Sequence, residues 1–400
     1  MATELAILGG ARTAMAEYVG TPGFGAFKDI SAIELGVHAA KAAIERSRVQ
    51  PAWIDHVILG NAMQTSADAI YGARHVGLKT GIPMEVPALT VNRLCGSGIQ
   101  SVVNAAHYLL LGEATCVLAG GMENMSQAPH VVRGAREGFR FGQQISLEDT
   151  LMGGLLDPYC GFFMAQTSDN CAKRYGITRQ AQDEFALRSH TEGARAVKAG
   201  LFKEEVVPVP VKRRKETVPF DTDDHIKPET TLEALAKLPP AFGKDGTVTA
   251  GNASGIVDGA AALVVSTAQF AKDHGCPVLG RIVSWAAAGV EPAYMGMGPA
   301  PAIRKALEKA GLRLEQVDLF EINEAFAGQY LSVEKELGLD RSKVNVNGGA
   351  IALGHPLGAT GTRLLLAVLM ELRRRKKSIG VASACIGGGQ GIAMAVRAES

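Results

Sequence analysis

Residues 91–98 read Val91-Asn92-Arg93-Leu94-Cys95-Gly96-Ser97-Gly98, a strand end that turns sharply and enters a long helix. The mostly apolar run from Ser97 to Leu111 predicts that helix, and Cys116 to Ala119 predicts a buried strand directly after it. A strand, a helix and a strand in close succession form the repeating unit of a domain whose sheet is covered on both faces. The sequence therefore predicts an α/β fold.

The same order of elements occurs in both terminal thirds of the chain. We expect strands at 6–8 and 56–59 with a helix at 33–46, and later strands at 278–284, 319–322 and 379–383 with helices at 300–310 and 364–375. The segment between them is rich in glycine and basic turns, with one helical stretch at 179–199. We therefore predict an N-terminal half at 1–124 completed by 256–274, a loop-rich insertion domain at 125–255, and a C-terminal half at 275–400.

Composition excludes several classes of protein. The 400 residues are 47% hydrophobic and carry 41 basic and 40 acidic side chains, so the chain is neither disordered nor a dedicated nucleic-acid binder. The N-terminus lacks a secretory leader and no apolar run approaches the roughly 20 residues that span a bilayer, so we expect a cytoplasmic protein without membrane contact. The run Lys212-Arg213-Arg214-Lys215 predicts a solvated turn, with contact to a phosphate as the alternative.

Cysteine and glycine usage narrows the chemistry. The six cysteines show no CxxC or Cys/His spacing, which favours reduced thiols and predicts no metal site. Glycine is in surplus, at 47 residues. Much of it clusters at 96–98, 348–361 and 387–391, where we expect the lack of a Cβ to admit backbone and substrate to reactive groups.

Cys95 is the first candidate for a reactive group. A cysteine at the start of a helix faces unpaired N–H groups and the positive end of the helix dipole, both of which lower the pKa of a thiol. The sequence thus predicts a thiolate nucleophile. The alternative is a small buried cysteine in a tight turn.

His355 is the second candidate, within Asn347-Gly348-Gly349-Ala350-Ile351-Ala352-Leu353-Gly354-His355-Pro356-Leu357-Gly358-Ala359-Thr360-Gly361. It stands between a glycine and a proline, which indicates a loop and not the face of an amphipathic helix. A histidine held in this way suits a base that must approach another loop. The alternative is a capping or core histidine.

The third candidate is Cys385, within Ser383-Ala384-Cys385-Ile386-Gly387-Gly388-Gly389-Gln390-Gly391. A strand at 392–396 follows the glycines and no Lys-Ser/Thr ends the loop, which argues against a phosphate-binding loop. Backbone N–H groups there can form an oxyanion hole. Two thiols and one histidine suggest a two-stage acyl transfer. Asn323, at a strand end, could hold a water or donate to an oxyanion; the alternative is that it only starts a helix.

These segments together resemble the thiolase family over essentially the whole chain. The resemblance rests on 92–98, on Asn323-Glu324-Ala325-Phe326, on 347–358 and on 385–391, in the family's order and spacing, with further matches at 120–126 and 249–255. It implies a duplicated five-layered α-β-α-β-α core with a loop-rich insertion domain. It also implies CoA thioesters (acetyl-CoA or 3-ketoacyl-CoA) and CoA as substrates, no tightly bound cofactor, and a homodimer or dimer of dimers whose tetramerisation loop matches 133–142.

The resemblance assigns roles to individual residues. It implies that Cys95 is the acylated nucleophile, His355 its activating base and Cys385 the acid/base for the α-proton. It implies one oxyanion hole from His355 and a water held by Asn323, and another from the backbone amides of Cys95 and Gly387. The CoA-binding and pocket positions that match are Lys227 (where an arginine is common), Ala250, Ser254, Leu155, Met164, Met295 and Phe326.

The expected activity is that of an acetyl-CoA C-acetyltransferase, which condenses two acetyl-CoA reversibly through Cys95. The alternative is a 3-ketoacyl-CoA thiolase of broader chain length acting in fatty-acid β-oxidation. Phe163 stands where acetoacetyl-CoA-forming members usually carry a histidine, which opposes strict short-chain specificity. A decarboxylating ketoacyl synthase is disfavoured because Asn323 occupies the place of its second histidine, and an inactive binding protein because all four reactive positions are filled.

Overall fold

The computed structural model describes residues 3–18, 25–213 and 215–399, and its main strands form one continuous path. In spatial order they are β15 (Leu319–Ile322), β16 (Ile379–Ile386), β17 (Gln390–Ala398), β14 (Gly280–Gly289), β1 (Leu5–Thr13), β13 (Val257–Thr267), β5 (Cys116–Glu123), β3 (His56–Gly60) and β4 (Ala88–Val91). Only two residue pairs, Ala6 with Arg281 and Ile7 with Gly280, join the two halves of this path at β1 and β14. The path is therefore two sheets that meet at one corner.

The strand order confirms the duplication that the element order predicted. From the corner outward, the spatial order is β1, β13, β5, β3 in the first sheet and β14, β17, β16, β15 in the second. In each sheet, the strand at the corner is the first of its half in the chain, and the strand next to it is the last of that half. The first sheet ends with β4, and the second has a single parallel bridge between Phe320 and Val344 at that place. The halves thus share a topology despite weak sequence similarity.

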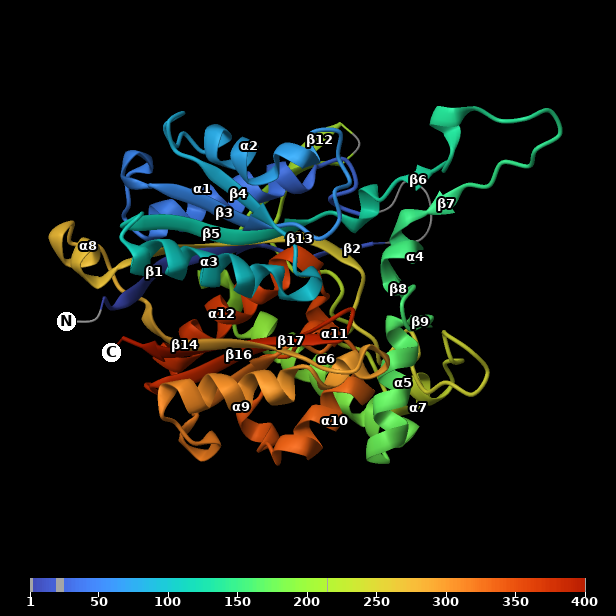
Figure 1. The fold of residues 1–400 in the computed structure, drawn as a ribbon. Helices are drawn as coiled ribbons and strands as arrows, with labels where there is room; N and C mark the ends of the chain where they lie inside the picture. The colour runs from blue at the N-terminus through green and yellow to red at the C-terminus, as the bar shows by residue number, and fades with distance from the viewer. Residues whose placement is uncertain (1–2, 19–24, 214, 400) are drawn as a thin grey trace.

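Helices separate and cover the two sheets in five layers (Figure 1). The outer helices are α1 (Ala32–Arg46) and α2 (Gly72–Lys79) on the first sheet, and α9 (Pro299–Ala310) and α10 (Ala327–Leu337) on the second. Between the sheets lie α3 (Ser97–Leu111) and α12 (Leu357–Arg374), each in contact with strands of both sheets. Three apolar clusters fill these layers, one between the sheets and one under each outer helix layer. Within the described residues, no helix combines the length and apolar character needed to cross a bilayer.

The helix predicted at 364–375 begins earlier than expected, at Leu357. Gly358 and Gly361 lie inside α12, although glycine disfavours a helix interior. Gly361 faces α3: a Cβ at Gly98 would lie 2.5 Å from the backbone nitrogen of Thr362, and one at Gly361 would overlap the backbone nitrogen of Ile99. Gly358 faces the first sheet, where a Cβ would lie 2.6 Å from the carbonyl oxygen of Met122. These glycines therefore admit neighbouring backbone to the start of α12, which is the backbone part of the prediction made for them.

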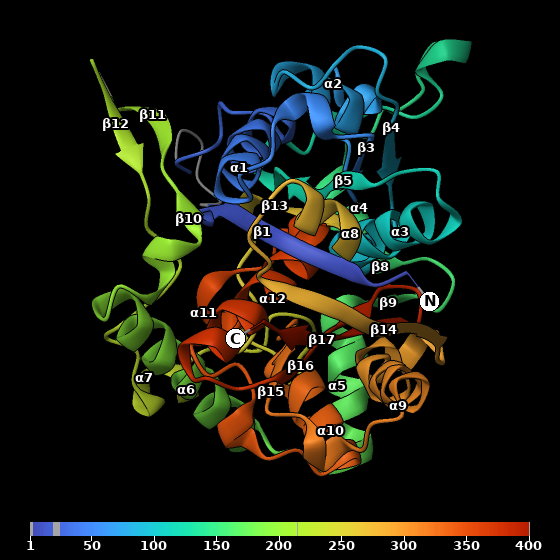
Figure 2. The same cartoon turned by 90° about the vertical axis from the view of Figure 1, so that its left-hand side faces the viewer.

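The segment 125–255 supplies two long helices, α5 (Met164–Tyr175) and α6 (Arg179–Lys198), and a series of short elements. Figure 2 shows the hairpin of β11 (Val209–Arg213) and β12 (Glu216–Phe220) at one side of the molecule. Lys212, Arg213 and Lys215 are exposed at its tip, as predicted for a solvated turn, and Arg214 lies outside the described residues. The other short elements of this segment are β6 (His130–Val131), β7 (Glu148–Asp149), α4 (Thr150–Leu155), β8 (Leu156–Asp157), β9 (Phe162–Phe163), β10 (Val206–Val207) and α7 (Leu232–Ala236). Outside it lie β2 (Ala16–Glu17), α8 (Ala268–Asp273) and α11 (Ala350–Leu353).

A buried ion-pair cluster attaches this segment to the first sheet. Arg12 of β1 is fully buried and donates to Asp223 at 2.7 Å and to Glu205 at 3.1 Å. A pair removed from water in this way is costly to break, because the remaining charge has no solvent to stabilise it. The cluster therefore fixes the insertion segment against β1.

Candidate active site

Cys95 lies in a tight turn between β4 and α3, as predicted. A 3₁₀ turn at Leu94–Gly96 precedes the helix, and Leu94 has φ of 45°, a left-handed conformation that is strained for a branched side chain. Two side chains hold the turn: Asn92 Oδ1 accepts from the N–H of Leu94 at 2.9 Å, and Ser97 Oγ donates to the carbonyl of Leu94 at 2.7 Å. These bonds fix the backbone at Leu94, directly before Cys95.

The prediction of a lowered pKa for Cys95 is wrong. Burial raises the pKa of the thiol to about 11, the backbone N–H groups of Gly387 and of Cys95 itself lower it, and the charge of Glu123 raises it. Desolvation thus outweighs the helix start. Cys95 is a thiol in the free protein and requires a base to become a nucleophile.

His355 provides a neutral base beside the start of α12. It precedes the N-cap residue Pro356 and is 6% exposed. Thr360 Oγ1 donates to the carbonyl of Pro356 at 3.0 Å and therefore accepts from Nδ1–H of His355 at 2.6 Å, which assigns the free electron pair to Nε2. Burial, with a smaller effect of Arg363, lowers the pKa of His355 to about 3. The imidazole is therefore neutral and able to accept a proton at Nε2.

Asn323 joins His355 to the second sheet. Its side chain donates from Nδ2 to His355 Nε2 at 3.2 Å, and its backbone N–H donates to the carbonyl of Ser383 in β16 at 2.9 Å. The side-chain oxygen Oδ1 is buried without a hydrogen-bond partner among the described residues. An unpartnered buried polar atom of this kind suits a water or a substrate group.

Cys385 is the penultimate residue of β16, two residues before the glycine turn that begins at Gly387, and its thiol is fully buried. Burial raises the pKa of Cys385 well above its usual range, and Cys95 is near enough to raise it further. A Cβ on Gly387 would meet Leu94 and the sulfur of Met164, at 3.2 and 3.3 Å. The structure thus brings together Cys95, His355, Asn323, Cys385 and Gly387, which lie far apart in the sequence.

A cavity of about 130 Å³ opens beside His355. Four of the predicted pocket residues line it: Leu155, Met164, Ser254 and Phe326. Met295 packs instead with Met164 and Phe326 against Cys385. Phe163, which the sequence linked to chain length, also lines the cavity. The lining residues that sequence reasoning did not assign to a pocket are Met125, Ala165, Phe242, Ala253, Gly255, Ile256 and Leu357.

Two predicted CoA-binding residues lie outside this cavity. Ala250 is exposed, and Lys227 Nζ donates to Glu17 Oε2 at 2.8 Å with half of its side chain exposed. Glu17 also pairs with His225, whose ring packs where a Cβ of Gly255 would lie. Lys227 therefore stands near the 253–256 wall of the cavity without entering it.

Two phenylalanines in contact with each other line the cavity. The rings of Phe163 and Phe242 lie 5.3 Å apart at an angle of 41°, a favourable arrangement for an aromatic pair. Phe163 belongs to β9 and Phe242 to an irregular segment, so their contact depends on the tertiary fold. The cavity lining is therefore apolar at Phe163, the position where acetoacetyl-CoA-forming members of the family usually carry a histidine.

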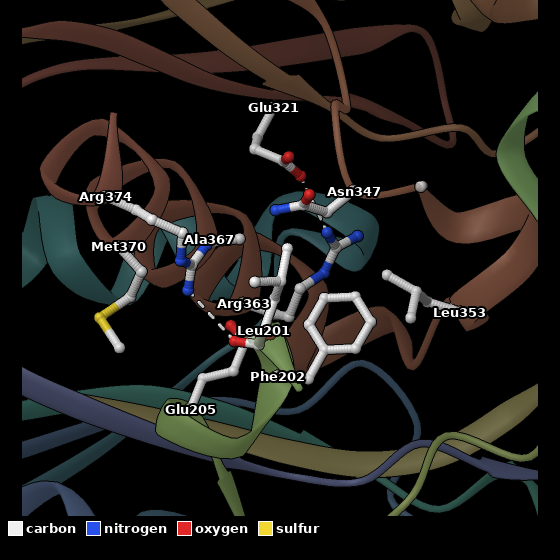
Figure 3. A pocket seen from close by; sticks show the side chains of 11 residues that line it. Leu201, Phe202, Glu205, Glu321, Asn347, Leu353, Arg363, Ala367, Met370 and Arg374 are labelled. Carbon is white, nitrogen blue, oxygen red and sulfur yellow. Dashed lines mark hydrogen bonds and ion pairs between the residues drawn. The ribbon is translucent and has the colours of Figure 1, made fainter. Parts of the chain in front are cut away.

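Charged side chains line a small pocket along α12, among them Arg363 of that helix and Glu321 (Figure 3). Arg363 donates to Glu321 of β15 at 2.9 Å, and both side chains are almost fully buried. Burial raises the pKa of Glu321 to about 8, against the lowering effect of Arg363. Since the charge of Arg363 lowers the pKa of His355, this pair helps to keep the imidazole neutral.

A duplicated α/β core that presents two thiols, a neutral imidazole and backbone N–H donors defines an acyltransferase. The family models describe the chain as "Thiolase, N-terminal domain" at residues 5–269 and "Thiolase, C-terminal domain" at residues 276–398. The chain belongs to the thiolase family, whose members transfer acyl groups of CoA thioesters.

Named relatives fall into two groups at similar identity. The human mitochondrial 3-ketoacyl-CoA thiolase is 52% identical over 94% of this chain and 95% of its own length. The acetyl-CoA acetyltransferase of Cupriavidus necator is 48% identical over 98% of this chain and 99% of its own length. The crystal structure of the human mitochondrial 3-ketoacyl-CoA thiolase in complex with CoA matches with a TM-score of 0.96 at 49% identity, covering 100% of this chain and 98% of that one.

Proposed function

We propose that this thiolase cleaves 3-ketoacyl-CoA substrates longer than acetoacetyl-CoA, with condensation as the reverse reaction. The observation that carries the chain-length preference is the apolar lining that Phe163 and Phe242 give to the cavity. A cavity of about 130 Å³ is close in size to those of roughly 150 Å³ that hold benzene, which suits an acyl chain of about six carbons. Each buried methylene contributes about 0.8 kcal/mol.

The first half-reaction begins at Cys95. His355 Nε2 takes the thiol proton, and the sulfur attacks the 3-keto carbon. The keto oxygen becomes an oxyanion, which accepts hydrogen bonds from the backbone N–H groups beside the site. The bond between C2 and C3 breaks, Cys385 gives its proton to C2, and acetyl-CoA leaves. The shortened acyl group stays on Cys95 as a thioester.

The second half-reaction restores both thiols. CoA gives its thiol proton to the Cys385 thiolate and attacks the acyl group on Cys95. The Cys95 sulfur leaves and recovers the proton that His355 held. Every proton is thus returned, and the two cysteines perform separate tasks.

A chain-length series tests the proposal. We expect kcat/KM for thiolysis to rise from four carbons to about eight, by roughly threefold to fourfold for each added methylene that enters the cavity. A maximum at four carbons would support the second candidate, acetyl-CoA C-acetyltransferase. That activity is favoured by the 48% identity to the enzyme of Cupriavidus necator.

We infer that the CoA moiety lies along the 250–255 segment. Ser254 lines the cavity, Ala250 is exposed beside it, and Lys227 carries a charge nearby for a phosphate. The human relative solved with CoA supports this assignment of the substrate. It agrees with the proposed insertion domain at 125–255, and CoA remains a substrate and not a tightly bound cofactor.

A cytoplasmic location stays a prediction, and the human relative is named as mitochondrial.

We also propose a homotetramer built through the loop 132–147. This loop extends away from the body of the molecule beyond the short strands β6 and β7 (Figure 1). Phe141 is fully exposed, and Ile145 and Leu147 are more than half exposed, which is typical of a surface that another chain covers. We expect a mass of about 168 kDa, four times 42.0 kDa, by light scattering, and a dimer mass for the F141S/L147S variant. A dimer in the unmodified protein would contradict this proposal.

A further inference from the structure

Glu123 is a buried carboxylate that the reaction described above does not use. It ends β5 and is fully buried. Its Oε1 accepts from Asn61 Nδ2 at 2.8 Å and from the N–H of Met63 at 2.9 Å, and its Oε2 accepts from the N–H of Ala62 at 3.0 Å and of Gly358 at 2.8 Å. Four N–H groups therefore occupy the lone-pair sites of one carboxylate.

One side of this arrangement leads to Cys95. The carbonyl of Ala62 accepts from Asn92 Nδ2 at 3.1 Å, and Asn92 in turn holds the strained turn at Leu94. Ala62 and Met63 also pack in the same apolar cluster as Cys95. Glu123 thus fixes the turn on which the conformation of the nucleophile depends.

The other side leads to His355. Gly358 lies in the first turn of α12, three residues after His355. A Cβ at Gly121 would overlap the carbonyl of Gly358, so the start of α12 is seated directly on β5 beside Glu123. One carboxylate therefore ties together the two loops that carry the nucleophile and the base.

The same side chain places a negative charge beside the nucleophile. A protonated carboxyl would direct its O–H at groups that are all donors, so the surrounding bonds favour the anion. Burial raises the pKa of Glu123 to about 7, the N–H groups of Ala62, Met63 and Gly358 lower it, and Asp258 raises it. Asp258 is itself held by Ser126, and the pKa of Cys95 rises with the charge of Glu123.

We propose that Glu123 is a positioning residue that sets the spacing of Cys95 and His355 and places a negative charge beside the nucleophile. The proposal rests on the proposed role of Cys95. Its consequence is that removal of the charge makes Cys95 more reactive while catalysis becomes slower. A carboxylate with only a structural role would not separate these two effects.

Glu324 offers a matched control on the other side of the site. It is also fully buried and accepts from Ser189 Oγ at 2.7 Å, Asn345 Nδ2 at 2.8 Å and the N–H of Ile351 at 3.2 Å. It therefore fixes the segment that leads to His355. Its charge raises the pKa of Glu321 and Tyr330, whereas the acid that raises the pKa of Cys95 is Glu123.

The experiment compares alkylation of Cys95 by iodoacetamide, followed by peptide mass spectrometry from pH 7 to 10, with kcat for thiolysis. For E123Q we expect alkylation at least about threefold faster, because loss of the negative charge beside the sulfur favours the thiolate, which is the form that reacts. We expect kcat to fall by about 100-fold, since misplacement by 1 Å costs on that order. For E324Q we expect a reduced kcat with alkylation within twofold of the unmodified protein.

E123D provides a variant that keeps the charge and shifts its position. It is expected to lower kcat without accelerating alkylation, and it replaces E123Q as the test of spacing if that variant does not fold. Equal or slower alkylation in E123Q, or equal acceleration in E324Q, would overturn the proposal. Acetylation of unmodified protein by acetyl-CoA is measured first. If the acetyl group is absent from Cys95, the proposed function is contradicted. The alkylation rates of the Glu123 variants still report whether Glu123 controls the reactivity of Cys95.

Discussion

The two halves of the molecule share a strand order but place different groups at equivalent positions. In the first half α3 follows a turn that carries Cys95, and in the second half α12 follows a turn that carries His355. The two helices pack against each other between the sheets, so the duplicated fold brings both turns to one place. A duplicated scaffold can thus supply a nucleophile from one copy and a base from the other.

The halves also differ in how they hold a cysteine. Cys95 is partly accessible in a strained turn, whereas Cys385 is fully buried within a strand end. Accessibility suits a thiol that takes up an acyl group, and enclosure suits one that exchanges a proton with a substrate carbon already bound. The comparison therefore assigns separate tasks to two residues of the same chemical type.

The largest expected effect comes from removing the accessible thiol. For Cys95→Ser we predict a loss of thiolysis on the order of 10⁴-fold, because the weakly acidic hydroxyl is a poor nucleophile even beside His355. Steady-state thiolysis of a 3-ketoacyl-CoA measures it. A loss of less than tenfold would show that the first half does not supply the nucleophile.

Removing the buried thiol separates the two tasks. For Cys385→Ser we predict that acetylation by acetyl-CoA survives while condensation slows by about 10³-fold, within the usual range for loss of a general acid or base. Rapid-quench acetylation and condensation assays measure the two steps. Slowed acetylation with normal condensation would reverse the assignment.

A third prediction concerns the neutral imidazole of the second half. His355 has a pKa of about 3 when folded and an ordinary value near 6.5 when unfolded, so the unfolded chain binds more protons as the pH falls. Its contribution to stability is complete above pH 6.5 and is lost as the pH falls towards 3. Between pH 8 and pH 5 we predict that the unmodified protein loses about 2 kcal/mol more unfolding free energy than His355→Gln. Urea unfolding measures this, and parallel pH profiles would contradict a buried neutral histidine.

The smallest expected effect lies in the insertion segment, which neither half supplies. For Phe163→His we predict that kcat/KM for an eight-carbon 3-ketoacyl-CoA falls about tenfold, because a polar ring next to the acyl chain costs roughly 1–2 kcal/mol. The value for acetoacetyl-CoA is expected to stay within threefold. Equal losses at both chain lengths would show that Phe163 acts on the site in general and not on the acyl chain.

The settings of the reactive residues were predictable because local sequence determines them. A strand, turn and helix around Cys95, a loop before His355 and a strand end at Cys385 each follow from neighbouring residues. The start of α12 was missed because Gly358 and Gly361 weaken the local helix signal, and only their contacts with the first sheet and with α3 explain them.

Other features depend on contacts between distant segments. Phe242 lies in an irregular segment without any local signal for a pocket, and it reaches Phe163 across 79 positions in the chain. The pKa of Cys95 was predicted in the wrong direction because its burial is a property of the whole fold. The bonds of Glu123 to Ala62 and Gly358 likewise join three distant segments.

The central claim is that one cysteine carries the acyl group and the other moves a proton. Its most direct test is peptide mapping after the unmodified protein is incubated with acetyl-CoA and quenched in acid. We predict an acetyl group on the peptide that contains Cys95 and none on the peptide that contains Cys385. An acetyl group on Cys385, with Cys95 unmodified, would contradict the account.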